Sequence, residues 1–201
     1  ALGASLVEID IEPFYETARL LYDGPWVAER YISVRTLIAS APEAMHSVTR
    51  QIILGGAKAS AADSFRAFYR LSALRRTAFD MFSRFDALMV PTVPAAYTQA
   101  QIEADPIALN SNLGTYTNFV NLLDLCGLAV PISFASNGTP YGVTFLTRSG
   151  RDAMLAGLGR VVHAQTELPL GALGVRQPLL PTLAPMTRAG EITIAVVGAH
   201  L

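Results

Sequence analysis

Two apolar runs joined by a short polar turn constrain the fold of this chain more than any other feature. Residues 129–134 and 141–147 are rich in the β-branched and aromatic side chains that β-strands favour. The connection between them, ASNGTP at 135–140, contains Asn137-Gly138, a strong signal for a tight hairpin turn. The pattern therefore predicts a β-hairpin built from buried strands.

Helical periodicity accounts for much of the remaining chain. Apolar residues recur at helical spacing in 13–21, and Gly24-Pro25 ends this helix and begins another that continues to about residue 38. Ser60, with Asp63 three residues later, is typical of a capping box at a helix N-terminus. Further helices are expected over residues 44–54, 60–85, 113–125 and 151–166.

Two more strands are expected upstream of the hairpin. Residues 6–11, LVEIDI, alternate between apolar and acidic side chains. Residues 87–90 form an apolar run, and the two prolines of PTVP at 91–94 direct the chain out of the sheet into an extended loop. The polar segment 98–112 is expected to be a loop with about one helical turn. Together these elements predict an α/β fold.

The balance of apolar and charged residues suggests that this chain is completed by another lobe. Its 201 residues suffice for one domain with a sizeable core. Hydrophobic residues make up 51% of the chain and charged residues 15%, whereas about 25% charged residues is usual in a soluble domain. We therefore expect another part of the protein to cover some apolar surface, although an unusually Ala- and Leu-rich core would explain the same numbers.

Charge and cysteine content argue against several classes of function. The formal net charge is −1 and no basic run is present, which argues against a nucleic-acid partner. No run of about 18 apolar residues predicts a membrane span, and no secretory leader is recognisable. The single cysteine, Cys126, lies in an apolar run, where it is expected to be an inert core thiol. A cytoplasmic location fits these features.

The last part of the chain loses helical and strand periodicity. Residues 167–190 contain prolines 169, 178, 181 and 185 together with several glycines, which is typical of an inter-domain linker. The apolar run 192–197 then predicts a strand. We accordingly divide the chain into a main domain over 1–166, a linker over 167–190, and the first strand of a smaller domain over 191–201.

Side chains that could support catalysis are scattered along the sequence. Lys58, the only lysine, lies in GGAKAS, which does not match the spacing of a phosphate-binding loop, and the neighbouring Ser60 is expected to cap a helix. Lys58 is therefore expected to lie in a solvated loop. His46, His163 and His200 lack the spacing of a metal site, so no metal is expected. We predict no catalytic residue within this chain.

Tyr22 and Arg30 flank the predicted helix corner at Gly24-Pro25, which could turn both side chains toward one cleft. A guanidinium matches a carboxylate with two parallel hydrogen bonds, and a phenol adds a directional one, so the pair suits a small planar anionic amide. Taken alone, the residues favour a simpler interpretation. In that interpretation Arg30 is a surface residue paired with Glu29 or Asp23, and Tyr22 packs at a helix end.

Several longer segments carry a family resemblance. The chain resembles the amidase signature hydrolases, and within them the allophanate hydrolases, in GPWVAERY, DALMVPTVP, ADPIALNSNLGTYTNFVNLLDLCGLAVP and GTPYGVTFL. The resemblance covers about residues 1–166 and implies the C-terminal half of the amidase signature fold, a mixed twisted sheet covered by helices. It also implies that a Ser-cisSer-Lys triad on an upstream half hydrolyses allophanate with release of ammonia in urea degradation. No cofactor is implied.

The same resemblance assigns roles to particular residues and partners. It implies that Arg30 holds the carboxylate of a small anionic amide substrate while Tyr22 fixes its orientation. Thr92 and Asn118 occupy positions that line the cleft in amidase folds, although structural roles are favoured for both. The implied partners are the N-terminal half of the amidase domain and a second copy of the protein in a homodimer. Three alternatives stay open: a general amidase, the amidase component of an amidotransferase, and a non-catalytic binding lobe.

Overall fold

The computed structural model describes residues 4–171 and 174–176. The chain divides into two units, Ala1–Leu168 and Pro169–Leu201. In the second unit, the described residues include an antiparallel bridge between Leu170 and Val175. Most of the predicted linker and the whole predicted strand at 191–201 lie outside the described residues. The remaining elements all belong to the first unit.

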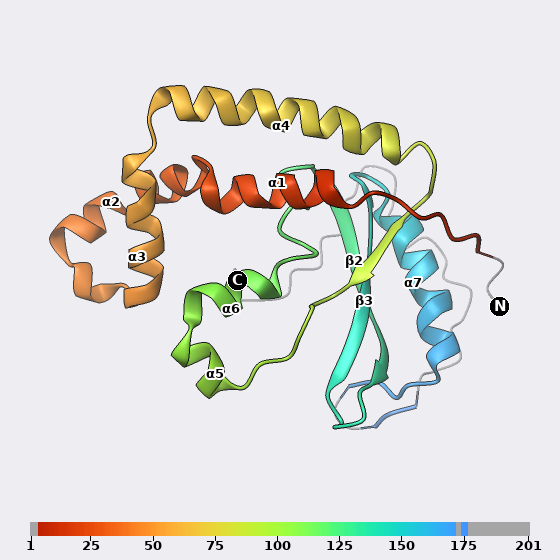
Figure 1. Cartoon of the computed structure of the whole chain (residues 1–201). Coiled ribbons are helices and arrows are strands. Elements are labelled where there is room, and N and C mark those ends of the chain that lie inside the picture. The colour runs from red at the N-terminus through yellow and green to blue at the C-terminus, as the bar shows by residue number, and fades with distance from the viewer. Residues whose placement is uncertain (1–3, 172–173, 177–201) are drawn as a thin grey trace, which may run out of the picture. The chain divides into compact units, whose positions relative to one another are not determined.

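A three-stranded antiparallel sheet forms the centre of the first unit in the part of the chain that is described (Figure 1). Its strand order is β1 (Leu88–Pro91), β3 (Pro140–Arg148) and β2 (Leu125–Phe134). The predicted hairpin between β2 and β3 is confirmed. Gly138 adopts a φ of 82°, and its N–H donates to the Ala135 carbonyl at 2.9 Å. Strand β2 begins at Leu125, earlier than its apolar run suggested.

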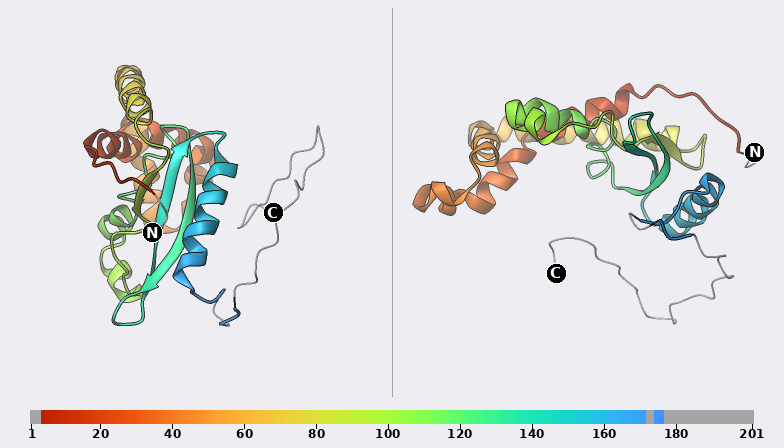
Figure 2. Two further views of the ribbon diagram at one scale, coloured as in Figure 1. Left: turned by 90° about the vertical axis from the view of Figure 1, so that its right-hand side faces the viewer. Right: turned by 90° about the horizontal axis from the view of Figure 1, so that it is seen from below.

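Each face of this sheet is covered by helices. Leu146 of β3 pairs with Leu88 of β1, and both belong to a core cluster shared with helices α1 (Glu12–Asp23) and α4 (Ala61–Met81). The neighbouring Phe145 belongs to a second cluster with Leu155 of helix α7 (Asp152–Thr166). Successive residues of a strand point to opposite faces, so α7 lies on one side of the sheet and α1 with α4 on the other. Figure 2 (left) shows this layered arrangement.

Helices α1 and α4 lie side by side above the sheet and form the larger part of the core. Phe14 of α1 is fully buried, with its ring 6.1 Å from Phe82 and 5.1 Å from Phe119. The predicted capping box at the start of α4 is confirmed: the Asp63 N–H donates to the Ser60 hydroxyl, and the Ser60 N–H donates to the Asp63 carboxylate. This exchange satisfies donors that the first helical turn leaves unpaired.

A second group of helices extends away from the sheet, and we call it the arm (Figure 1). It consists of α2 (Trp26–Ser40), the short 3-10 turn η1 (Pro42–Ala44), α3 (Ser47–Gly55) and the 3-10 turn η2 (Gly56–Lys58). Its buried residues are Val27 and Gly56, at the end next to α1. The arm therefore contributes little to the core.

The loop predicted over 98–112 is wrong. The segment forms two helices, α5 (Gln99–Ala104) and α6 (Pro106–Leu113). Thr98 and Gln101 form a capping box for α5, and the Asp105 carboxylate accepts from the Ala108 N–H at the start of α6. Polar side chains therefore act as helix caps here, which the loop prediction overlooked.

Two other predicted elements are also wrong. Residues 6–11 form no strand, and within the described structure no neighbouring strand supplies hydrogen bonds to them; Leu6 is 89% exposed. The helix expected over 113–125 is replaced by successive turns, and Phe119, Leu122 and Leu123 of this segment are buried in the core cluster. Asp124, at a φ of 53°, then leads into β2.

None of the helices in the described residues is long and apolar enough to span a membrane.

Candidate functional site

A cleft of about 950 Å³ lies where the arm joins the packed helices. Its walls come from α1, the corner before α2, the α3–η2 junction, α4 and α6. The helix corner is built on Gly24, whose N–H donates to the Leu20 carbonyl at 3.0 Å. A Cβ at this glycine would lie 2.3 Å from the same carbonyl oxygen, so a larger residue would displace the end of α1.

Tyr22 lines this cleft from the last turn of α1. Its ring is half-buried and packs against the core cluster that contains Phe14. The structure therefore combines the two interpretations of Tyr22, because one side chain packs against the core and also borders the cleft.

Arg30 lies on the second turn of α2 and is exposed. It is not among the residues that line the cleft around Tyr22. In the described residues, the structure thus brings Tyr22 to the cleft and leaves Arg30 on the adjoining surface of the arm.

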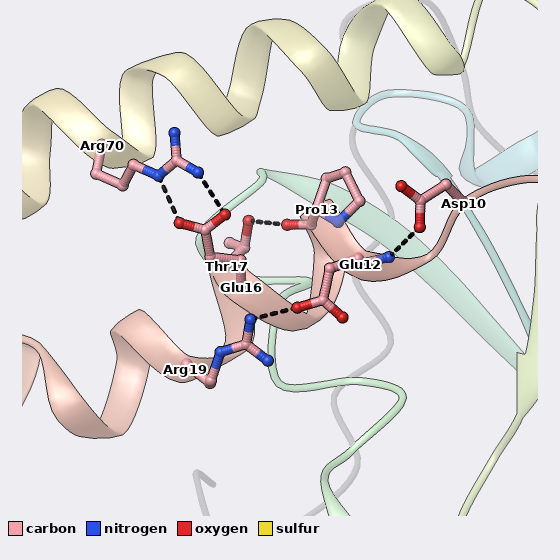
Figure 3. Close-up of polar contacts among 7 residues, drawn as sticks. All are labelled: Asp10, Glu12, Pro13, Glu16, Thr17, Arg19 and Arg70. Atoms are coloured by element: carbon pink, nitrogen blue, oxygen red, sulfur yellow. Dashed lines mark hydrogen bonds and ion pairs between the residues drawn. The ribbon is translucent and has the colours of Figure 1, made fainter.

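The cleft is rich in basic side chains. Arg19, Lys58, Arg66 and Arg70 line it together with the acidic residues Glu16 and Asp63. Figure 3 shows Arg70 of α4 bonding both carboxylate oxygens of Glu16 on α1. These hydrogen bonds lower the pKa of Glu16 and raise the pKa of Arg70. Glu16 thus stays ionised and holds α1 to α4.

The other acidic group of the cleft is also committed to ion pairing. Asp63 accepts from Arg66 in addition to its capping contacts with Ser60. The hydrogen bonds from Ser60, and after them the one from Arg66, lower the pKa of Asp63 to about 2. Another arginine of the cleft, Arg19, pairs with Glu12 at 2.5 Å (Figure 3).

Lys58 differs from these arginines because it has no ion pair among the described residues. It is exposed, as predicted, but it ends the 3-10 turn η2 and borders the cleft. Gly56 lets this turn pack directly on the backbone of α2, because a Cβ at residue 56 would lie only 2.4 Å from the Val27 carbonyl oxygen. The sequence analysis did not predict that Lys58 borders a cleft. The preceding Gly55-Gly56 was the available signal, because Gly56 packs directly on the Val27 backbone.

Thr92 and Asn118 have structural contacts and do not line this cleft. The Thr92 hydroxyl lies 3.0 Å from that of Thr144, and its N–H donates to the Gly142 carbonyl. Asn118 packs so closely on Gly114 that a Cβ there would lie 2.2 Å from its Oδ1 atom. Both contacts agree with the structural roles that the sequence analysis favoured.

The remaining candidates show no catalytic arrangement. Ser60 acts as a helix cap, and Cys126 is partly buried with its Sγ 3.3 Å from the Arg148 carbonyl oxygen. The described residues contain no cluster of His, Cys, Asp or Glu that could hold a metal ion. His200 lies outside the described residues.

Comparison with known proteins gives a consistent pattern. Residues 1–156 match the family model described as Amidase. The chain is 38% identical to the urea amidolyase of Saccharomyces cerevisiae over 99% of this chain and 11% of that protein. It is 30% identical to a glutamyl-tRNA(Gln) amidotransferase component of Synechococcus elongatus over 85% of this chain and 36% of that protein.

Among solved structures, the allophanate hydrolase of Kluyveromyces lactis superposes with a TM-score of 0.79 and 37% identity. The match covers 82% of this chain and 27% of that chain. The chain therefore spans about a quarter of that hydrolase and about a tenth of the urea amidolyase.

Proposed function

Because this chain belongs to the amidase family, we propose that it is the substrate-recognition half of an amide hydrolase that acts on allophanate, the carboxylated form of urea. The allophanate hydrolase and urea amidolyase among its relatives support this assignment. The observation that carries the proposal is a tyrosine, Tyr22, in a cleft rich in basic side chains. Such a cleft suits a small anionic amide better than a neutral or cationic one.

The chemical step is assigned to an upstream half of the same amidase domain. A serine there would attack the terminal amide carbonyl, while a lysine acting through a second serine would carry the proton to the departing ammonia. Backbone N–H groups would stabilise the oxyanion that forms on the carbonyl. This chain would position the substrate: Arg30 by pairing with the carboxylate and Tyr22 by a hydrogen bond that orients the amide.

The exposure of Arg30 has a consequence for this mechanism. Arg30 does not line the cleft, and it is exposed in the described part of the chain, so burial there does not fix its position. We therefore propose that the upstream half encloses Arg30 together with Tyr22, so that the recognition site is complete only when both halves are present.

Location and assembly are part of the same proposal. The single cysteine and the absence of a basic run in the sequence agree with a metabolic enzyme of the cytoplasm. A homodimer is proposed on the basis of the family resemblance, and analytical ultracentrifugation of the full-length protein tests it.

Steady-state kinetics of the full-length enzyme test the recognition role. Arg30→Ala should lower kcat/KM for allophanate by about 10- to 100-fold, the usual range for a hydrogen bond to a charged group, with the main effect on KM. Tyr22→Phe should lower it by about fivefold. Activity on a neutral amide should change much less. Arg35→Ala, an exposed arginine on the same helix, is the matched control.

Unchanged allophanate kinetics in Arg30→Ala would remove this arginine from the recognition site. A general amidase or the amidase component of an amidotransferase is the second candidate, which the similarity to the glutamyl-tRNA(Gln) amidotransferase supports. A substrate panel separates the two, because a general amidase would turn over simple neutral amides better than allophanate.

A further inference from the structure

Helix α4 carries apolar side chains on two opposite faces. One face packs into the molecule through the buried residues Ala67, Leu71, Leu74 and Ala78. The other face consists of Phe65, Phe68, Tyr69 and Phe79, which are 61%, 54%, 71% and 38% exposed. At about 100° per residue these four side chains fall within a sector of about 100°. We call them the outer aromatic face.

The packed part of the chain does not cover this face. Figure 1 shows α1 along one side of α4 and no described element along the other, and Figure 2 (left) agrees. Phe68 makes an edge contact with Trp26 at 5.6 Å, and Phe65 lies 6.4 Å from Tyr69, but both phenylalanine rings stay more than half exposed. Four large aromatic side chains in one stripe form an apolar patch of the kind that marks an interaction site.

Charge and length indicate what covers the patch. Arg76 lies in the same sector, bonded to the Ser72 hydroxyl at 3.2 Å, and no ion pair in the described residues neutralises it. A surface with apolar side chains and an acidic group would complement the patch. The solved allophanate hydrolase has nearly three quarters of its length beyond the matched region, which leaves ample polypeptide to supply that surface.

We propose that the outer aromatic face is the docking surface for the upstream half of the amidase domain in the same polypeptide. The upstream half would place apolar side chains against Phe65 and Tyr69 and an acidic side chain near Arg76. Helix α4 also carries Arg66 and Arg70, which line the cleft. Docking on the outer face of α4 would therefore fix the position of this wall of the cleft. The proposal rests on the proposed function in one respect, namely that such an upstream half exists.

Site-specific cross-linking in the full-length protein tests the contact directly. The photoreactive residue p-benzoylphenylalanine is introduced at Tyr69, and at Tyr141 of the hairpin as a control with similar exposure, 50%. After irradiation, the Tyr69 position should cross-link within one polypeptide to a peptide preceding Ala1, as identified by mass spectrometry. Cross-links between two copies, or only to residues of the 201-residue chain, or none at all, would each overturn the proposal.

Charged substitutions provide a second readout. Phe65→Asp combined with Tyr69→Asp should lower the Tm of the full-length protein by about 5 °C or more, because carboxylates would enter a desolvated contact. Tyr141→Asp should leave the Tm nearly unchanged, and equal shifts in the two proteins would count against the contact. Neither readout uses substrate, so an enzyme that acted on another amide would refute the proposed function without altering the cross-link.

Discussion

The sheet with its covering helices and the arm differ sharply in how their side chains are used. In the first region, Phe14, Leu146 and Leu155 are at most 1% exposed, and each contacts residues distant in sequence. In the arm, Ile32 and Leu37 are 65% and 42% exposed. The first region is stabilised by contacts within this chain, whereas the arm has an apolar surface that the described residues do not cover.

The difference bears on the proposed function because the arm carries Arg30, which we propose holds the substrate carboxylate. Its position relative to Tyr22 depends on the short junction where Gly56 meets the backbone of Val27. A side chain on a weakly buried element can be repositioned by a partner surface at low energetic cost. The comparison therefore predicts that core substitutions affect stability most, junction substitutions less, and helix-cap changes least.

The largest effect is expected in the core. Leu146→Ala should lower the free energy of unfolding by about 2–5 kcal/mol, because it removes a fully buried side chain at the contact between sheet and helices. Ile32→Ala in the arm should change it by about 0.5 kcal/mol or less. Denaturant unfolding of the 201-residue chain measures both values. Similar losses in the two variants would mean that the arm is packed like the core.

The junction offers a test with adjacent residues. Gly56→Ala should destabilise the chain by about 1–3 kcal/mol, because the new Cβ would clash with the Val27 backbone. Gly55→Ala places a Cβ in open space on a helical residue and should be neutral or stabilising by up to about 1 kcal/mol. Thermal unfolding of the two variants checks this.

Kinetics of the same pair connect the junction to recognition. In the full-length enzyme, Gly56→Ala should also raise the KM for allophanate, since the clash moves α2 and with it Arg30. An unaltered KM in a folded Gly56→Ala enzyme would show that the junction does not set the position of Arg30.

The smallest effect concerns pH and the start of α4. The folded pKa of Asp63, about 2, lies below its unfolded value, so its carboxylate stabilises the fold above about pH 4 and loses this effect as the pH falls toward 2. Ser60→Ala removes the first cause of the shift and should raise the pKa of Asp63, as measured by NMR titration. Ser72→Ala, in the middle of the helix, is the control. A pKa that stays near 2 in Ser60→Ala would assign the shift to the Ser60 N–H and Arg66, whose hydrogen bonds the substitution leaves in place.

Local chemical signals explain which elements were predictable. Asn137-Gly138 specified the hairpin, Gly24-Pro25 the corner between α1 and α2, and Ser60 with Asp63 the start of α4. Each signal acts through hydrogen bonds or backbone preferences within a few residues, so no knowledge of the rest of the fold is needed. The cap of α5 at Thr98 is a signal of the same kind that the loop prediction overlooked.

Elements that depend on distant partners were not predictable in this way. The alternation of residues 6–11 is that of a strand, but a strand requires a neighbour, and the described structure places none beside it. The segment after Leu113 has helical spacing, yet it forms successive turns, with Phe119 and Leu123 in the core cluster that contains Phe14. In both cases the outcome depends on residues far away in the sequence, which a local pattern does not describe.

The sequence by itself determined the α/β class, the hairpin, the cap of α4 and, through resemblance, the amidase family that the comparisons support. Only the tertiary structure decided that Tyr22 borders a basic cleft, that Lys58 joins it, and that Arg30 stands exposed on the arm. The physical reason is the range of the interactions. The hydrogen bonds of caps and turns are formed between near neighbours in sequence, whereas a cleft exists only where helices far apart in the chain meet.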